Sequence, residues 1–106
     1  MPEISKKFLW VDDIRKPPDV GFADKIEDSQ WLWVGDYEEA KIALSVYEFE
    51  TISLDFDLGE GKTGLDILIW AHNHGLCPEK VLFHSQNPVG RARMENYYNI
   101  DMERNK

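Results

Sequence analysis

A short apolar strand that ends in two carboxylates is the feature that most constrains the fold of this chain. Residues 51–64 read TISLDFDLGEGKTG, and the run at 52–54 has the length and apolar character of a buried strand. Asp55 and Asp57 follow it two residues apart, so both point to one face of an extended chain. A glycine-rich turn then leads into an amphipathic helix. Acids at the carboxyl end of such a strand occupy the place where open α/β sheets carry their active sites.

The rest of the chain alternates in the same way between strands and helices. Further strands are predicted at residues 8–11, 31–34 and 81–84. Helix starts are predicted at Asp36, at Thr63 or Gly64, and at Asn87-Pro88, and Gly75 is predicted to end the second helix. Two prolines in residues 14–21 predict an irregular crossover, followed by a short helical turn at 22–27.

This alternation predicts one α/β domain over residues 1–106, a doubly wound parallel sheet with helices on both faces. In such sheets the first and third strands lie side by side at the centre. Their carboxyl ends carry Asp12, Asp13 and Asp55. Acids that are far apart in the sequence are therefore predicted to converge at one edge of the sheet.

Convergent carboxylates suit a hard divalent cation, Mg²⁺ or Mn²⁺. Three close carboxylates repel one another, and a cation between them removes that repulsion. Asp12, Asp13 and Asp55 are the predicted ligands, and the side chain of Asp57 either joins them or caps the turn at Gly59. The alternative is that an acidic chain places aspartates at loops and helix caps without any metal.

Composition narrows the classes of partner. The 106 residues carry a net charge of −8, which disfavours an extended nucleic-acid surface but permits a small phosphorylated ligand or a single RNA end. The single cysteine, Cys77, excludes an internal disulfide framework and is typical of a reducing compartment. With no signal peptide and no apolar span, the sequence predicts a cytoplasmic protein that does not associate with membranes.

Several side chains near the predicted cation are suited to phosphate chemistry. His84 is a general acid–base candidate, although a structural histidine is an equal alternative. Ser85 and Asn87 can donate to phosphate oxygens beside a helix N-terminus, and Asn87 caps that helix in either case. Arg91 lies one turn into the helix, and Arg15 follows the acidic pair; either guanidinium can bind a phosphate, while Arg15 can instead neutralise carboxylates.

This constellation resembles the receiver fold of response regulators, which is flavodoxin-like. Asp12, Asp13, Asp55 and Ser85 match its acidic pair, its central aspartate and its hydroxyl residue, and Gly64 resembles the glycine that closes the loop after the central aspartate. Receivers carry a lysine on a fifth strand, for which this chain has no counterpart. The resemblance therefore implies a sheet truncated to four main strands.

A closer resemblance covers nearly the whole chain. VDDIRKPP, ISLDFDLGEGKTGLDI and FHSQNPVGRARM are similar to the signature blocks of the cyclic-phosphate processing receiver-like family of bacteria and phages. That family usually has a histidine between the two aspartates of the third strand, where this chain has Phe56. The resemblance implies an activity on cyclic phosphates, such as those at damaged RNA ends.

Two hypotheses on function follow. The first is a metal-dependent phosphodiesterase in which Asp55 binds the cation and His84 transfers a proton. The second is a non-enzymatic receiver-like module, one that is phosphorylated at Asp55 or binds a protein partner, and that could be a phage-encoded regulator.

Overall fold

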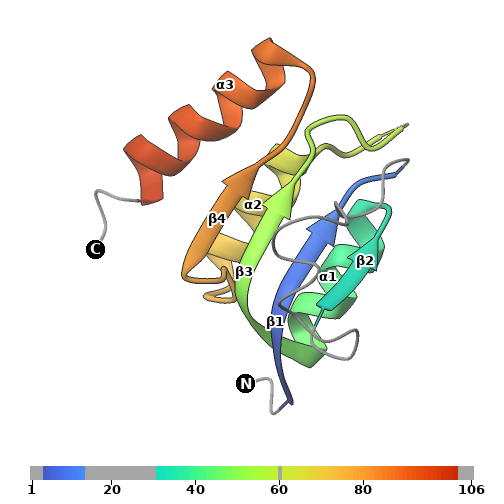
Figure 1. Cartoon of the computed structure of the whole chain (residues 1–106). Helices are drawn as coiled ribbons and strands as arrows, with labels where there is room; N and C mark the ends of the chain where they lie inside the picture. The colour runs from blue at the N-terminus through green and yellow to red at the C-terminus, as the bar shows by residue number, and fades with distance from the viewer. Residues whose placement is uncertain (1–3, 14–30, 60, 103–106) are drawn as a thin grey trace.

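The chain folds around one sheet of four parallel strands. The computed structural model describes residues 4–13, 31–59 and 61–102. The strands β1 (Ile4–Val11), β2 (Trp31–Val34), β3 (Tyr47–Leu54) and β4 (Lys80–Phe83) lie in the order β2-β1-β3-β4 (Figure 1). The first and third strands are neighbours at the centre, as predicted. The described residues thus confirm an α/β, flavodoxin-like sheet of four strands.

Helices follow the second, third and fourth strands. They are α1 (Tyr37–Val46), α2 (Gly64–Asn73) and α3 (Pro88–Tyr97), and a π-helical turn, η2 (Tyr98–Met102), extends α3. α1 and α2 pack on one face of the sheet, whereas α3 lies beside the outer edge of β4 (Figure 1). The predicted crossover at 14–21 and the helical turn at 22–27 lie outside the described residues.

Local capping explains why each helix begins where it does. Asp36 accepts a hydrogen bond from the backbone N–H of Glu39 at the start of α1 (2.8 Å). Thr63 and Asp66 form a reciprocal capping box at the start of α2. Asn87 caps α3, with proline at its first position. All three predicted starts are confirmed. Gly75 follows the actual C-cap of α2, with φ +67°, a left-handed conformation that glycine adopts without strain.

Side chains of the central strands alternate between the two faces of the sheet. On the helix-covered face the apolar residues are fully buried: Leu9, Val11, Ile52 and Leu54. Phe8, Trp10 and Ser53 point to the opposite face, and Trp10 pairs in register with Ser53 on β3 and with Trp33 on β2. At the carboxyl-terminal edge of the sheet, this second face carries the polar residues of the candidate site.

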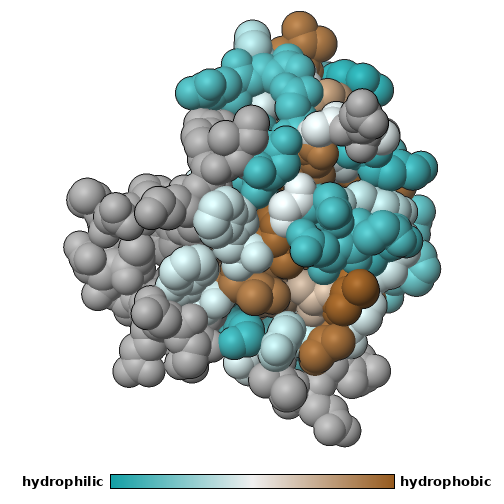
Figure 2. Space-filling view, turned by 90° about the vertical axis from the view of Figure 1, so that its right-hand side faces the viewer, coloured by the Kyte–Doolittle hydropathy of each residue, from teal (hydrophilic) through white to brown (hydrophobic). Residues whose placement is uncertain are grey.

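The side of the molecule formed by β2 and α1 has a mixed surface. Ile42 and Val46 of α1 are exposed there, 65% and 45%. Figure 2 views this side and shows apolar residues in small groups among hydrophilic ones. In the part of the chain that the structure describes, no helix is both long enough and apolar enough to cross a bilayer.

Candidate metal centre

Three polar residues occupy the same position on three adjacent strands, the first residue after the strand ends. They are Asp12 after β1, Asp55 after β3 and His84 after β4. Each donates its backbone N–H to the last carbonyl of a neighbouring strand. The bonds are Asp12 to Val34 (3.1 Å), Asp55 to Val11 (3.0 Å) and His84 to Leu54 (3.1 Å). The ladder of the sheet therefore fixes the backbone of all three at one edge.

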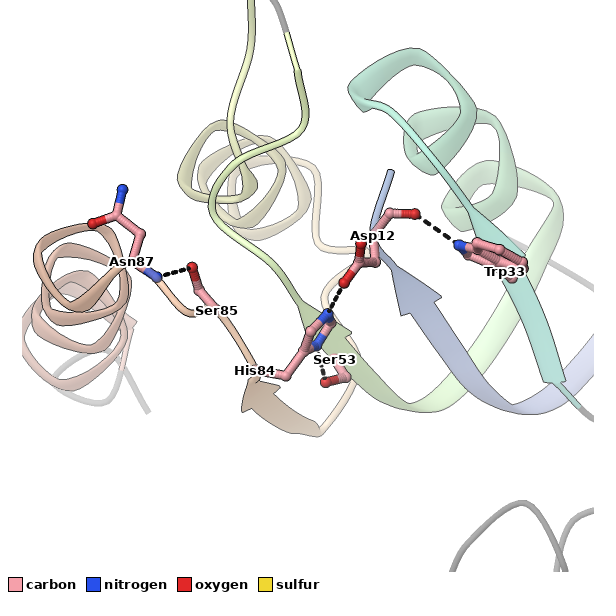
Figure 3. Close-up of polar contacts among 6 residues, drawn as sticks. All are labelled: Asp12, Trp33, Ser53, His84, Ser85 and Asn87. Atoms are coloured by element: carbon pink, nitrogen blue, oxygen red, sulfur yellow. Dashed lines mark hydrogen bonds and ion pairs between the residues drawn. The ribbon is translucent and has the colours of Figure 1, made fainter. Parts of the chain in front are cut away.

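The imidazole of His84 lies back across β3 toward β1 (Figure 3). Its Nε2 lies 3.1 Å from Oδ2 of Asp12, and its Nδ1 lies 2.7 Å from Oγ of Ser53. The ring stacks on Trp10, with the ring centres 3.7 Å apart and the planes 8° from parallel. The contacts with Asp12, Ser53 and Trp10 thus help to hold the ring of His84 in place.

Asp12, Asp55 and His84 bring donor atoms close enough to hold a metal ion. One ligand atom from each lies within 4.8 Å of the other two. Asp12 is 1% exposed and Asp55 is 7% exposed, so both carboxylates are shielded from water. A cation between them would offset the repulsion of two buried negative charges. Two carboxylate oxygens and one imidazole nitrogen form a donor set that fits a divalent ion such as Mn²⁺.

The other two predicted ligands, Asp13 and Asp57, are not part of this group of three. Asp13 is exposed and lies beside Gly59, so that a Cβ on Gly59 would come within 3.5 Å of its Oδ2. Asp57 is also exposed, and it accepts a hydrogen bond from the side-chain amide of Asn87 (3.2 Å). Neither belongs to the group of potential ligands found among the described residues. His84, predicted as a proton-transfer group, lies where a ligand would.

Two of the predicted phosphate-binding residues, Ser85 and Asn87, lie between His84 and α3. Ser85 is buried, and its Oγ accepts a hydrogen bond from the backbone N–H of Asn87 (3.1 Å). Asn87 uses both ends of its side chain, since Oδ1 accepts from the N–H of Gly90 (3.0 Å) and Nδ2 donates to Asp57. Asn87 therefore caps α3, as predicted. Ser85 and Asn87 connect the metal-side edge of the sheet to the N-terminus of α3 (Figure 3).

Arg91 is the predicted guanidinium that the structure describes. It is half-exposed, and its Nε lies 3.9 Å from Oε2 of Glu95 one turn later, a weak surface pair. Together with Ser53 and His84 it lines an open groove of about 540 Å³ along the outer edge of β4. Arg15, the other predicted guanidinium, lies outside the described residues.

Two glycines allow the loop after Asp55 to pack tightly. The N–H of Gly64 donates to the carbonyl of Phe56 (3.0 Å), and a Cβ on Gly64 would stand 2.1 Å from the carbonyl oxygen of Asp55. Phe56 turns toward α3, where a Cβ on Gly90 would meet its ring at 2.3 Å. Phe56, which stands where the family that this chain resembles usually has a histidine, therefore packs against α3.

Sequence reasoning missed three residues that surround the cluster. Ser53 and Trp10 contact His84, and the indole Nε1 of Trp33 donates to the carbonyl of Asp12 (2.7 Å). Ser53 did carry a signal, because it is a polar residue inside an apolar strand and shares the face of Asp55 two residues on. The tryptophans carried none, since a strand tryptophan is ordinarily a packing residue.

Comparison with known protein families agrees with this geometry. A family model described as the cyclic-phosphate processing receiver domain matches residues 7–99. The chain belongs to this family. The match takes in β1 from residue 7 onward, the other three strands, all three α-helices and Asp12, Asp55 and His84, and it confirms the resemblance carried by the three sequence blocks. Searches of curated proteins and of solved structures gave no match.

Proposed function

We propose that this receiver-family domain is a metal-dependent phosphoesterase that opens cyclic phosphates, such as 2′,3′-cyclic phosphates of nucleotides or RNA ends. The observation that carries the proposal is the cluster of Asp12, Asp55 and His84 at the ends of three adjacent strands. The family description, which names cyclic-phosphate processing, supports this choice of substrate class. The net charge of −8 favours a small ligand or a single RNA end over an extended nucleic acid.

The residues divide into those that hold a cation and those that bind the phosphoryl group. A divalent cation held by Asp12, Asp55 and His84 would act as a Lewis acid on the phosphoryl oxygen. The hydroxyl of Ser85 supplies a donor for a phosphoryl oxygen, and the positive end of the α3 dipole favours the anion. Arg91, on the groove beside His84, binds the substrate anion from the β4 side.

His84 has a different role in this proposal from the one that the sequence predicted. A general acid needs a ring nitrogen that faces the leaving oxygen. Here Nδ1 lies against Ser53 and Nε2 faces Asp12. We therefore assign His84 to cation binding. Asn87 is likewise assigned to capping α3 and holding Asp57, because both ends of its amide are engaged.

The test is hydrolysis by the purified chain. The substrates are 2′,3′-cyclic nucleotides and an RNA oligomer with a 2′,3′-cyclic phosphate end, each with Mg²⁺, Mn²⁺ or a chelator. We expect turnover that requires metal and that falls about a hundredfold or more in Asp55→Asn. Glu48→Gln is the matched control, since it makes the same carboxylate-to-amide change near the start of β3, away from the cluster. Absence of metal-dependent turnover on every substrate would refute the proposal.

The second candidate is a receiver-like module without catalysis. One observation favours it: the side-chain Nδ2 of Asn87 already donates to Asp57, which leaves fewer side-chain donors for a substrate. Incubation with a small phosphodonor such as acetyl phosphate distinguishes the two. A labile adduct on Asp55, seen by intact mass and abolished in Asp55→Asn, together with no turnover, would select the module. The 7% exposure of Asp55 argues against it.

A further inference from the structure

The row of residues just below the metal cluster contains one small side chain. Ser53 lies on β3 between Trp10 of β1 and Leu82 of β4, which pair with it in register. It is 3% exposed, and the ring of His84 lies against it. A much larger residue at this position, such as leucine or phenylalanine, would occupy the space that the ring uses to reach Asp12. The size of Ser53 is therefore one condition for the cluster.

The hydroxyl of Ser53 supplies a second condition. We propose that Ser53 is a positioning residue that presents Nε2 of His84 as a metal ligand, and that the centre consequently selects a first-row transition-metal ion over Mg²⁺. This inference rests on the metal centre of the proposed function. It adds the residue that sets the histidine's geometry and the class of ion that the centre takes.

The argument begins with the proton of a neutral imidazole. One ring nitrogen carries the proton and the other carries a lone pair. A carboxylate only accepts, so we assign the ring proton of the ion-free protein to Nε2, which faces Asp12; Nδ1 then accepts from the Ser53 hydroxyl, 2.7 Å away. To coordinate an ion through Nε2, the ring must carry its proton on Nδ1 instead. A hydroxyl can donate in the first state and accept in the second, so the Nδ1 hydrogen bond persists in both.

The ion class follows from the donor atoms. Mg²⁺ prefers six oxygens in a near-ideal octahedron and gives up water reluctantly. An imidazole nitrogen suits Zn²⁺, Co²⁺, Ni²⁺ and Fe²⁺, and affinity in mixed nitrogen–oxygen sites rises along the series from Mn²⁺ toward Cu²⁺. A centre in which His84 takes the place of one carboxylate therefore loses more affinity for Mg²⁺ than for these transition-metal ions.

The experiment uses a pair of variants with equal shape. Ser53→Thr keeps the hydroxyl, and Ser53→Val replaces it with a methyl group of similar size. Isothermal titration of the ion-free proteins with Mg²⁺, Mn²⁺ and Co²⁺ gives the affinities. We expect wild type to bind Co²⁺ at least about tenfold more tightly than Mg²⁺. We expect Ser53→Val to bind Co²⁺ about 10–100-fold more weakly than Ser53→Thr does.

A spectroscopic measurement separates positioning from mere packing. Long-range ¹H–¹⁵N correlation of the Zn²⁺-loaded wild type should show His84 with its proton on Nδ1 and a metal-shifted Nε2. Ser53→Ala, which leaves the space open and cannot overpack the row, should lose this single tautomer. Thermal unfolding of the ion-free variants checks that each one is folded.

The outcomes distinguish this inference from the proposed function. If wild type binds no divalent ion, the metal centre and this inference both fail. If wild type binds Mg²⁺ as tightly as Co²⁺, or if the threonine and valine variants bind Co²⁺ equally, this inference fails while the phosphoesterase proposal stands. If cobalt selectivity and the threonine–valine difference appear without turnover, the inference holds and the phosphoesterase proposal fails.

Discussion

Replacement of Gly64 by alanine tests how the chain holds Asp55 in place. The Cβ of an alanine would stand 2.1 Å from the carbonyl oxygen of Asp55 and 3.1 Å from the sulfur of Met94. Ordinary contacts begin near 3.4 Å. The start of α2 and the end of β3 would therefore have to separate by more than about 1 Å, since the first contact is with backbone and not with a flexible side chain.

The expected loss of stability combines opposing terms. Overpacking of this kind costs about 1–3 kcal/mol, and weakening the 3.0 Å hydrogen bond from Gly64 to Phe56 adds about 1 kcal/mol. Alanine offsets this by up to about 1 kcal/mol, because it favours a helix over glycine. We expect a net loss of about 1–3 kcal/mol, and each kcal/mol lowers the Tm of a domain of this size by about 4–8 °C.

Urea unfolding followed by tryptophan fluorescence measures the stability, and Mn²⁺ titration measures the centre. Gly64→Ala should lose both stability and Mn²⁺ affinity, because Asp55 moves with its carbonyl. The control is Gly75→Ala, where φ is +67° and a Cβ meets nothing within 4 Å. That variant should lose about 1 kcal/mol from backbone strain alone and keep its metal affinity. A Gly64→Ala protein as stable as wild type would show that the close approach does not constrain the loop.

Further predictions concern three other residues, Gly90, Cys77 and Thr63. Gly90→Ala should destabilise the protein by about 1–3 kcal/mol through its contact with the Phe56 ring, and less in a Phe56→Ala background, which a double-mutant cycle by urea unfolding detects. Burial raises the pKa of Cys77 to about 11, so alkylation by iodoacetamide at pH 8 should be about a hundredfold slower in the folded than in the unfolded protein. Since the raised pKa belongs to the folded state, the associated stability is present below the unfolded pKa and is lost as pH rises toward 11; urea unfolding between pH 8 and 11 measures this. Thr63→Ala should remove one half of the capping box with Asp66 and cost about 1 kcal/mol in the same unfolding assay.

Local interactions account for what the sequence predicted well. The helix starts at Asp36, Thr63 and Asn87 depend on a side chain that bonds backbone three residues away, so a short window of sequence contains the whole cause. The bounds of β2 were likewise read from a short apolar run between polar residues. Such features need no knowledge of the tertiary fold.

Long-range pairing explains the strand residues that the sequence did not predict. β1 begins at Ile4 and β3 at Tyr47, earlier than their apolar runs indicate. These extensions are rich in charged residues, and they hold together by pairing with each other. Lys7 lies 3.1 Å from Glu50 across the two strands, and the ammonium group of Lys6 lies 4.9 Å from the centre of the Tyr47 ring. Because these residues are polar, a prediction based on hydrophobic runs does not assign them to strands.

The candidate metal site shows the same division between local and long-range causes. Strand ends identified Asp12 and Asp55, because acids directly after two central strands must meet at one edge. The third donor depended on which face each side chain takes. Asp12 shares the face of Trp10, two residues before it, while Asp13 follows on the other side of the chain. His84, two residues after Leu82, lies on the same face, and its ring reaches Asp12 across Ser53, the small intervening residue of β3. A sequence shows that a serine is present, but the space above it exists only once three strands are paired in register.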